Sequence, residues 1–198
     1  MPETPPTLSA LPALEAEVEY AEVARRLATA PGVSAVEVNL AVPDAAELGV
    51  LDAREPFHVG AAVSTVLREL PRGVPVLAKL RPDPVRVAES VKVAADAGAG
   101  AVVLGGALPA SLPDGRPAGL SGPAVSPLAL RCVTDARAAL DAAGAECDVI
   151  ACGGIGTAED ARTALRLGAV AVQVGSALFH DPTTAARLAA ALDPDEGA

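Results

Sequence analysis

The chain has 198 residues, and 51% of them are hydrophobic but only 2% aromatic, so we expect one domain over 1–198 with a core of alanine, valine and leucine. Its net charge of −10 argues against nucleic acid and anionic membrane surfaces as partners. No apolar run is long enough to span a bilayer, and the 3 cysteines lack metal-ligand spacing. We therefore expect a cytoplasmic protein with reduced thiols and no metal site.

Helical and extended patterns alternate along the chain. Prolines in residues 1–12 favour disorder there, although residues 7–11 also fit a strand. The apolar pattern predicts strands at about 33–40, 74–80, 101–105, 148–153 and 169–175. It predicts helices over 13–29, 56–70, 158–167 and 181–192, and two more that start at the N-caps Asp83 and Ser126. Such alternation favours a barrel or a doubly wound sheet, and no G-x-G-x-x-G motif follows an early strand to indicate dinucleotide binding.

A long segment rich in glycine and proline, residues 105–125, is predicted to be a loop. Loops of this length in compact domains are usually functional. Within it, the sequence GLSG at 119–122 offers small residues and backbone donors. His58 and His180 lie near predicted helix starts and are interpreted as structural.

Two successive apolar strands end in glycine. Gly153 and Gly154 follow the first strand, and Gly175 and Ser176 follow the second. A helix with Thr157 as its N-cap joins these strands into a βαβ unit, and a phosphate can approach bare N–H groups at such strand ends. One Gly-Gly pair would be explained by a tight turn alone. Two glycine-ended strands in succession favour phosphate binding, as after strands 7 and 8 of a (β/α)8 barrel.

Three polar side chains lie on strands that otherwise read as buried. Alternation places Glu37 and Asn39 on one face of their strand, which would point into a barrel. Lys79 lies near the end of the next strand between apolar neighbours, where burial needs an anionic or polar partner. A snorkelling surface lysine is the alternative, but its place at a strand end favours a ligand contact.

These residues belong to five motifs in a set order: VEVNL at 36–40, PVLAKL at 75–80, GLSGPAV at 119–125, CGGI at 152–155 and QVGSA at 173–177. Together they resemble the dihydroorotate dehydrogenases, closest to the class 1B catalytic subunit. The resemblance implies a (β/α)8 barrel that binds FMN and oxidises dihydroorotate to orotate in pyrimidine synthesis. It also implies a partner subunit that carries FAD and an iron–sulfur cluster.

The resemblance assigns roles residue by residue. It implies that Asn39 and Lys79 contact the flavin, and that Lys79 places positive charge near the ring. Gly105 and Gly122 would make backbone contacts. The FMN phosphate would be held by the two glycine-ended strands, at Gly153, Gly154, Gly175 and Ser176, as the strand pattern independently predicts.

The departures from the family pattern fall on the substrate side. The family has Ser-Cys-Pro-Asn where this chain has residues 41–44, so its general base is replaced by Val42 and its orotate-binding Asn by Asp44. A second orotate-binding pair, Asn-Thr, falls at Gly106 and Ala107. The chain also begins at the family's third strand, so we expect a partial barrel without the first two strands. Its open sheet edges predict a homo-oligomer.

Three hypotheses follow. The first is a dihydroorotate dehydrogenase-like flavoprotein whose matched base position is lost and for which no catalytic residue is assigned. The second is a non-catalytic paralogue or truncated product with a binding or assembly role. The third is another phosphate-binding barrel enzyme, because glycine-ended strands serve many chemistries; the order of the motifs disfavours it.

Overall fold

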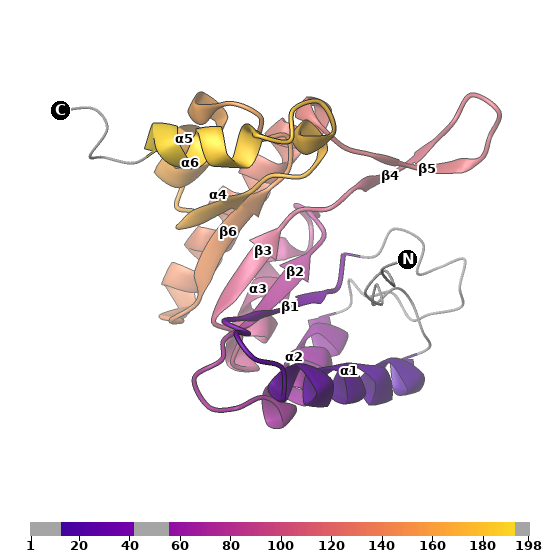
Figure 1. Ribbon diagram of the computed structural model, residues 1–198, viewed down its shortest axis with the longest axis vertical. Coiled ribbons are helices and arrows are strands. Elements are labelled where there is room, and N and C mark those ends of the chain that lie inside the picture. The colour runs from indigo at the N-terminus through magenta and orange to yellow at the C-terminus, as the bar shows by residue number, and fades with distance from the viewer. Residues whose placement is uncertain (1–12, 42–55, 193–198) are drawn as a thin grey trace.

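The computed structural model describes residues 13–41 and 56–192, in which helices alternate with parallel strands (Figure 1). The strands are β1 (Val36–Asn39), β2 (Val76–Leu80), β3 (Ala101–Leu104), β4 (Leu108–Ser111), β5 (Pro117–Leu120), β6 (Asp148–Cys152) and β7 (Ala171–Gln173). The helices are α1 (Ala13–Ala28), α2 (Pro56–Glu69), α3 (Val87–Asp96), α4 (Ser126–Ala143), α5 (Ala158–Arg166) and α6 (Thr184–Leu192), with short 3₁₀ helices η1 (Pro123–Val125) and η2 (Ser176–Phe179).

The main sheet has five parallel strands in the order β1-β2-β3-β6-β7. Each connection between successive strands of this sheet contains a helix, as parallel pairing requires. Helices α2 to α5 pack against the strands, and α1 packs against α2 in a further layer. Figure 1 shows these helices along the outer side of the sheet. This order is the one expected of a barrel segment.

The two faces of the sheet differ in burial. On the face under the helices, Val76, Val102 and Val149 are each 0% exposed. The central strand β3 is buried on both faces, since Val103 on the opposite face is also 0% exposed. On the other face, Glu37, Leu77, Lys79, Ile150 and Gln173 are only partly buried. The alternation follows from the period of two along a strand. The apolar core therefore lies between sheet and helices, and the polar side chains occupy the inner face.

Curvature brings the two edge strands of the sheet together. The side-chain amide of Gln173 on β7 donates to a carboxylate oxygen of Glu37 on β1, at 2.5 Å. Three strands separate β1 from β7 in the sheet order. Neighbouring strands lie about 4.8 Å apart, so this contact requires a sheet that curls toward its inner face as in a barrel.

The predicted strands of the main sheet are confirmed with shorter bounds, and Thr157 is confirmed as the N-cap of α5. Two other caps are wrong. Helix α3 begins at Val87, after a turn in which the Asp83 carboxylate accepts from the Val85 N–H at 3.0 Å. Ser126 is the first residue of α4, because η1 precedes it directly. The predicted strand at 7–11 and the disorder at 1–12 lie outside the described residues.

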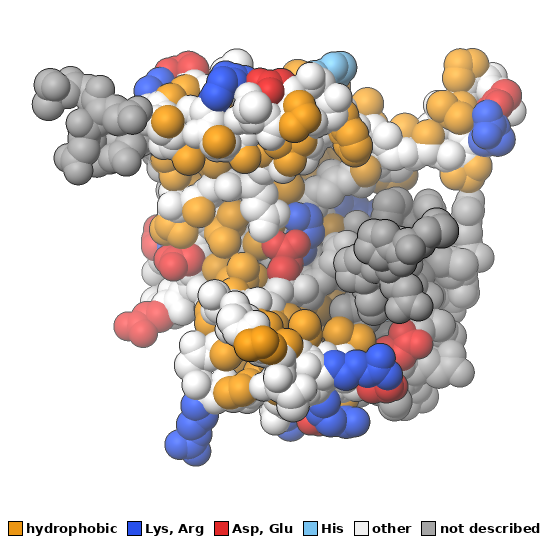
Figure 2. Space-filling view, in the orientation of Figure 1, with side chains coloured by type: hydrophobic (Ala, Val, Ile, Leu, Met, Phe, Trp, Pro, Cys, Tyr) orange, Lys and Arg blue, Asp and Glu red, His pale blue; other side chains and the backbone are white. Residues whose placement is uncertain are grey.

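The predicted loop at 105–125 contains an antiparallel hairpin, β4 with β5. Prolines 109 and 117 hid it, because proline is depleted in strands. The turn is set by Gly115 at φ +84 and by the Asp114 carboxylate, which accepts from the Arg116 N–H at 3.1 Å. Figure 2 shows the hairpin as a protrusion rich in hydrophobic side chains, with a charged group near its tip, where Arg116 pairs with Asp114.

Candidate functional site

A cleft of about 730 Å³ opens where β3, β6 and β7 end. Five of the residues predicted for the cofactor line it: Gly122, Gly153, Gly154, Gly175 and Ser176. They come from three segments that are separate in sequence: the end of the hairpin, the turn after β6 and the turn after β7. The structure thus brings both predicted groups to one cavity, at the carboxyl ends of parallel strands where barrel sites form.

The glycine turns present backbone donors to this cleft. Within the described residues, the N–H groups of Gly153, Gly154, Gly175 and Ser176 donate to no backbone carbonyl. A Cβ added at Gly122 or Gly175 would have no atom within 4 Å, so open space lies beside both. Bare N–H groups next to open space form a cradle for an anion. This geometry fits the phosphate of FMN.

Other glycines of the site are fixed by packing. A Cβ at Gly154 would lie 2.6 Å from the Cβ of Ser126 at the start of α4, and its φ of +72 also favours glycine. A Cβ at Gly105 would lie 2.0 Å from the carbonyl oxygen of Cys152, so only glycine fits between the ends of β3 and β6. Gly105 is buried and does not line the cleft.

The N-terminus of α5 is already occupied by a carboxylate. Asp160 accepts from the N–H groups of Gly156 and Thr157, at 3.2 and 2.9 Å, and from the Thr157 hydroxyl at 2.7 Å. These hydrogen bonds, with the hydroxyl contributing most, lower the pKa of Asp160. An anionic ligand is therefore directed to the glycine turns rather than to this helix end.

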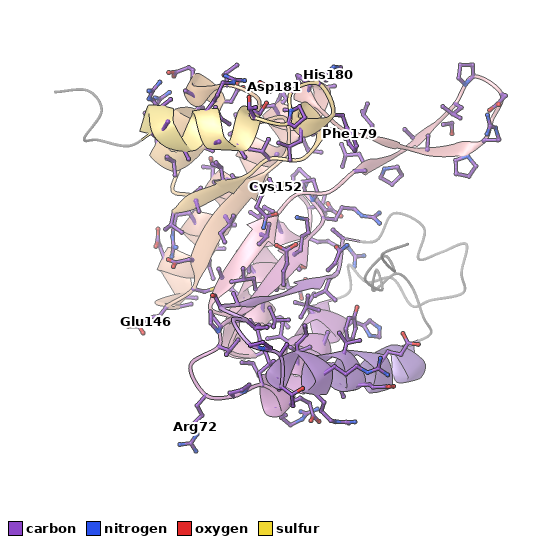
Figure 3. The ribbon with its side chains drawn as sticks, in the orientation of Figure 1. Arg72, Glu146, Cys152, Phe179, His180 and Asp181 are labelled. Carbon is purple, nitrogen blue, oxygen red and sulfur yellow. The ribbon has the colours of Figure 1, made fainter. Side chains whose placement is uncertain are left out.

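One wall of the cleft comes from the segment between η2 and α6. Phe179, His180, Asp181 and Arg187 line it, and Figure 3 shows the first three close together near the cleft. Hydrogen bonds from Thr183 and the Arg187 guanidinium lower the pKa of Asp181 to about 2. Asp181 therefore carries its charge at neutral pH, paired with Arg187 at 2.8 Å. His180, interpreted from sequence as structural, lies at this wall.

Four side chains of the inner face form a polar cluster beneath the cleft: Glu37, Lys79, Cys152 and Gln173. The Lys79 ammonium donates to the Gln173 amide oxygen at 2.6 Å and lies 3.3 Å from a Glu37 carboxylate oxygen. It also lies 3.7 Å from the Cys152 sulfur. Lys79 and Asn39 do not line the cleft, whereas Gln173 and Cys152 do. The polar partner that the sequence demanded for Lys79 is thus found within the protein.

The predicted flavin contact Asn39 has a local role. Its side-chain oxygen accepts from the Ala41 N–H at 3.1 Å and so shapes the turn after β1. The residues that follow, including Val42 and Asp44, lie outside the described residues. Gly106 and Ala107 line the cleft, and Gly106 has a φ of +132.

The three cysteines fall into two classes. Cys132 and Cys147 are buried, and burial raises the pKa of their thiols to about 12 and about 11. Cys152 is partly exposed at the cleft. Sequence reasoning assigned no site role to Cys152 or Gln173. Cys152 directly precedes Gly153 and Gln173 lies two residues before Gly175, so closeness to a predicted glycine turn was the available signal.

Neither a metal centre nor a membrane-spanning helix is found among the described residues. No group of three or more His, Cys, Asp or Glu side chains in residues 13–41 and 56–192 is arranged to hold a metal ion. None of the helices in those ranges is long and apolar enough to cross a membrane.

Comparison with known proteins points to one family. The model of the family described as dihydroorotate dehydrogenase matches residues 10–194. Catalytic subunits of dihydroorotate dehydrogenase B (NAD(+)) from Maridesulfovibrio salexigens and Geobacter sulfurreducens are 37% and 38% identical over 195 and 184 residues. These alignments cover 94% and 88% of this chain but 62% and 58% of the relatives. The chain thus spans about three fifths of their length.

A solved structure gives the same fold. Dihydroorotate dehydrogenase of Eimeria tenella, in complex with ferulenol, superposes with a TM-score of 0.72 at 20% sequence identity. The match covers 87% of this chain and 52% of that one. It confirms the predicted barrel-family fold, of which this chain forms a part. With the family model and the relatives above, it places the chain in the dihydroorotate dehydrogenase family.

Proposed function

We propose that this chain is a flavoprotein that binds FMN in the cleft, with the phosphate on the glycine turns after β6 and β7. Members of the family are FMN-dependent flavoproteins. The observation that carries the proposal is the set of N–H groups at Gly153, Gly154, Gly175 and Ser176, which line the cleft and donate to no backbone carbonyl, with open space beside Gly175. Gly122 would add a backbone contact from the opposite wall.

Different residues of the chain would contact different parts of FMN. The glycine turns hold the phosphate, and the ends of β3, β6 and β7 support the ring system. Lys79 lies beneath the cleft in an ion pair with Glu37, so that part of its positive charge would act on the ring. Bound FMN supplies a hydride acceptor, which no protein side chain provides.

We further propose that the family reaction, oxidation of dihydroorotate, is lost or residual here. The relatives are named for that reaction, but the base position holds Val42, which cannot accept a proton. Gly106 and Ala107 offer no side-chain hydrogen bond to a substrate in the cleft. These positions keep the second hypothesis open, a non-catalytic paralogue or truncated product with a binding or assembly role. Membership of the family removes the third.

The test compares two ligands that differ only in the phosphate. Purified protein is titrated with FMN and, separately, with riboflavin, and quenching of flavin fluorescence reports binding. We expect one FMN per chain and at least about hundredfold weaker binding of riboflavin, because several charge-assisted hydrogen bonds are missing. Equal affinities would contradict the phosphate cradle, and absence of FMN binding would contradict the proposed function.

Partners follow from the sheet edges and from the relatives. β1 and β7 are the edge strands of the main sheet, and unpaired edges favour association. We propose a homo-oligomer in the cytoplasm, and a complex with the electron-transfer subunit that the resemblance implies. Light scattering on the purified chain tests the first of these; a stable monomer that stays soluble would contradict it.

A further inference from the structure

The cluster beneath the cleft contains a closed ring of three side chains, which we call the charge ring: Glu37, Lys79 and Gln173. Lys79 Nζ donates to Gln173 Oε1 at 2.6 Å, and Gln173 Nε2 donates to Glu37 Oε2 at 2.5 Å. The ring closes through the ion pair of Lys79 Nζ with Glu37 Oε1 at 3.3 Å. Its members come from β1, β2 and β7, so the ring forms only because the sheet curls.

The chemistry of the two charged members fixes the orientation of the amide. An ammonium has only hydrogens to donate, and an ionised carboxylate has only oxygens to accept. Gln173 must therefore turn its oxygen to Lys79 and its nitrogen to Glu37. The amide is held from both sides, and it retains one N–H and one oxygen lone pair for a ligand.

The three members of the charge ring differ in their access to the cleft. Gln173 lines the cleft, but Glu37 and Lys79 do not. The side chains of Lys79 and Glu37 are 16% and 29% exposed. Two partly buried opposite charges at 3.3 Å act on the cleft as a nearly neutral pair, so the field of Lys79 reaches a ligand only after partial cancellation.

We propose that Glu37 is a positioning residue that lowers the reduction potential of the bound flavin by compensating Lys79, with Gln173 as the member of the ring that touches the cofactor. This inference rests on the proposed binding of FMN. Reduction adds negative charge to the flavin, so an uncompensated ammonium below it favours the reduced form. Removal of the Glu37 charge then tightens binding of reduced FMN relative to oxidised FMN.

The experiment measures the midpoint potential of bound FMN in the wild type, three variants of the charge ring and one control variant. For Glu37→Gln, which keeps the size and one acceptor oxygen but removes the charge, we expect the affinity ratio of reduced to oxidised FMN to rise about tenfold. That is about 30 mV more positive for a two-electron couple. Lys79→Met shifts the potential in the negative direction. The double variant returns toward the wild-type value, because neither charge remains.

Glu69→Gln is the matched control. It removes the same charge from an ion pair with Arg25 at 2.9 Å in the outer helices. In this control we expect the affinity ratio of reduced to oxidised FMN to stay within twofold of the wild-type ratio. Circular dichroism establishes that each variant is folded. An unchanged potential in Glu37→Gln overturns the inference alone, and so does a double variant that follows Lys79→Met. A wild-type protein that binds no FMN overturns the proposed function and this inference with it.

Discussion

The two ends of the cleft differ in what they present to a ligand: backbone groups at one end and small apolar residues at the other. At the β6–β7 end the ligand would meet backbone N–H groups, held in place by the packing of Gly154 against Ser126. At the β3 end it would meet Gly106 and Ala107, which carry no polar side chain. A backbone site survives most substitutions, because only added bulk or a changed turn removes it. A side-chain site is lost with each residue that changes, so we expect cofactor binding to persist in this chain where substrate turnover is lost.

The largest expected effect concerns dihydroorotate. We expect bound FMN to be reduced by dithionite at the normal rate but by dihydroorotate at least about 10²–10⁴-fold more slowly than in a family member with its base, since that is the usual contribution of general-base catalysis. Anaerobic stopped flow at the flavin absorbance measures both rates. Fast bleaching by dihydroorotate would show that the two ends of the cleft are not separable.

Restoration of the substrate end should fail at Gly106. Its φ of +132 is rarely adopted by other residues, and a Cβ there would lie 3.1 Å from the Cβ of Ala41. Val42→Cys with Asp44→Asn is therefore expected to recover little turnover, and addition of Gly106→Asn should lower the melting temperature rather than raise the rate. A gain in rate from the triple variant would show that the turn adapts.

At the backbone end, Gly175→Val should abolish the preference for FMN over riboflavin. Gly175 has a φ of −119 and nothing within 4 Å of an added Cβ, so the side chain enters the open space without a clash. We expect FMN affinity to fall about hundredfold with unchanged stability. Ala142→Val, exposed at the far end of α4, is the control for added volume. Unchanged FMN affinity in Gly175→Val would contradict the placement of the phosphate at this turn.

Substitution of two glycines that line the cleft should affect stability to different extents. Gly154→Ala would press its Cβ against Ser126 at 2.6 Å, and overpacking of this kind costs about 1–3 kcal/mol. Gly175→Ala should change the free energy of unfolding by less than about 0.5 kcal/mol. Urea denaturation of both variants measures the difference. Equal destabilisation would mean that Gly175 is also a packing residue.

How far the sequence predicts this molecule depends on whether a feature is local. The Thr157 cap and the glycine turns are encoded within a few residues, and the structure shows them at the predicted strand ends. The hairpin was missed because its prolines disguise the strands. The contact of Glu37 with Gln173 spans 136 residues and depends on sheet curvature, which no local pattern contains. The place of Val42 and Asp44 stays a prediction.

Thiol labelling gives a smaller effect that still distinguishes the cleft from the core. Iodoacetamide at pH 8 should modify Cys152, which is partly exposed, and leave Cys132 and Cys147 unmodified, since burial keeps both as neutral thiols. Saturation with FMN should slow the labelling of Cys152 several-fold. Mass spectrometry of tryptic peptides identifies the site. An equal labelling rate of Cys152 with and without FMN would place the ligand away from β6.

The smallest effect concerns acid stability at the cleft wall. The pKa of Asp181 falls from 3.8 to about 2 through its Thr183 and Arg187 contacts. A depressed folded-state pKa contributes stability that is complete above the unfolded value and is lost as pH falls toward the folded value. Wild type should therefore melt slightly higher than Asp181→Asn at pH 6, and the gap should close between pH 4 and pH 2. Because the carboxylate is exposed, solvent screens most of the gain.

Asp114→Asn on the hairpin, whose carboxylate is likewise exposed and paired with arginine, is the control for charge removal alone. FMN affinity should weaken in Asp181→Asn and not in Asp114→Asn, because only Asp181 holds a wall of the cleft. Equal FMN affinity in the two variants would confine the cofactor to the glycine turns and the inner face.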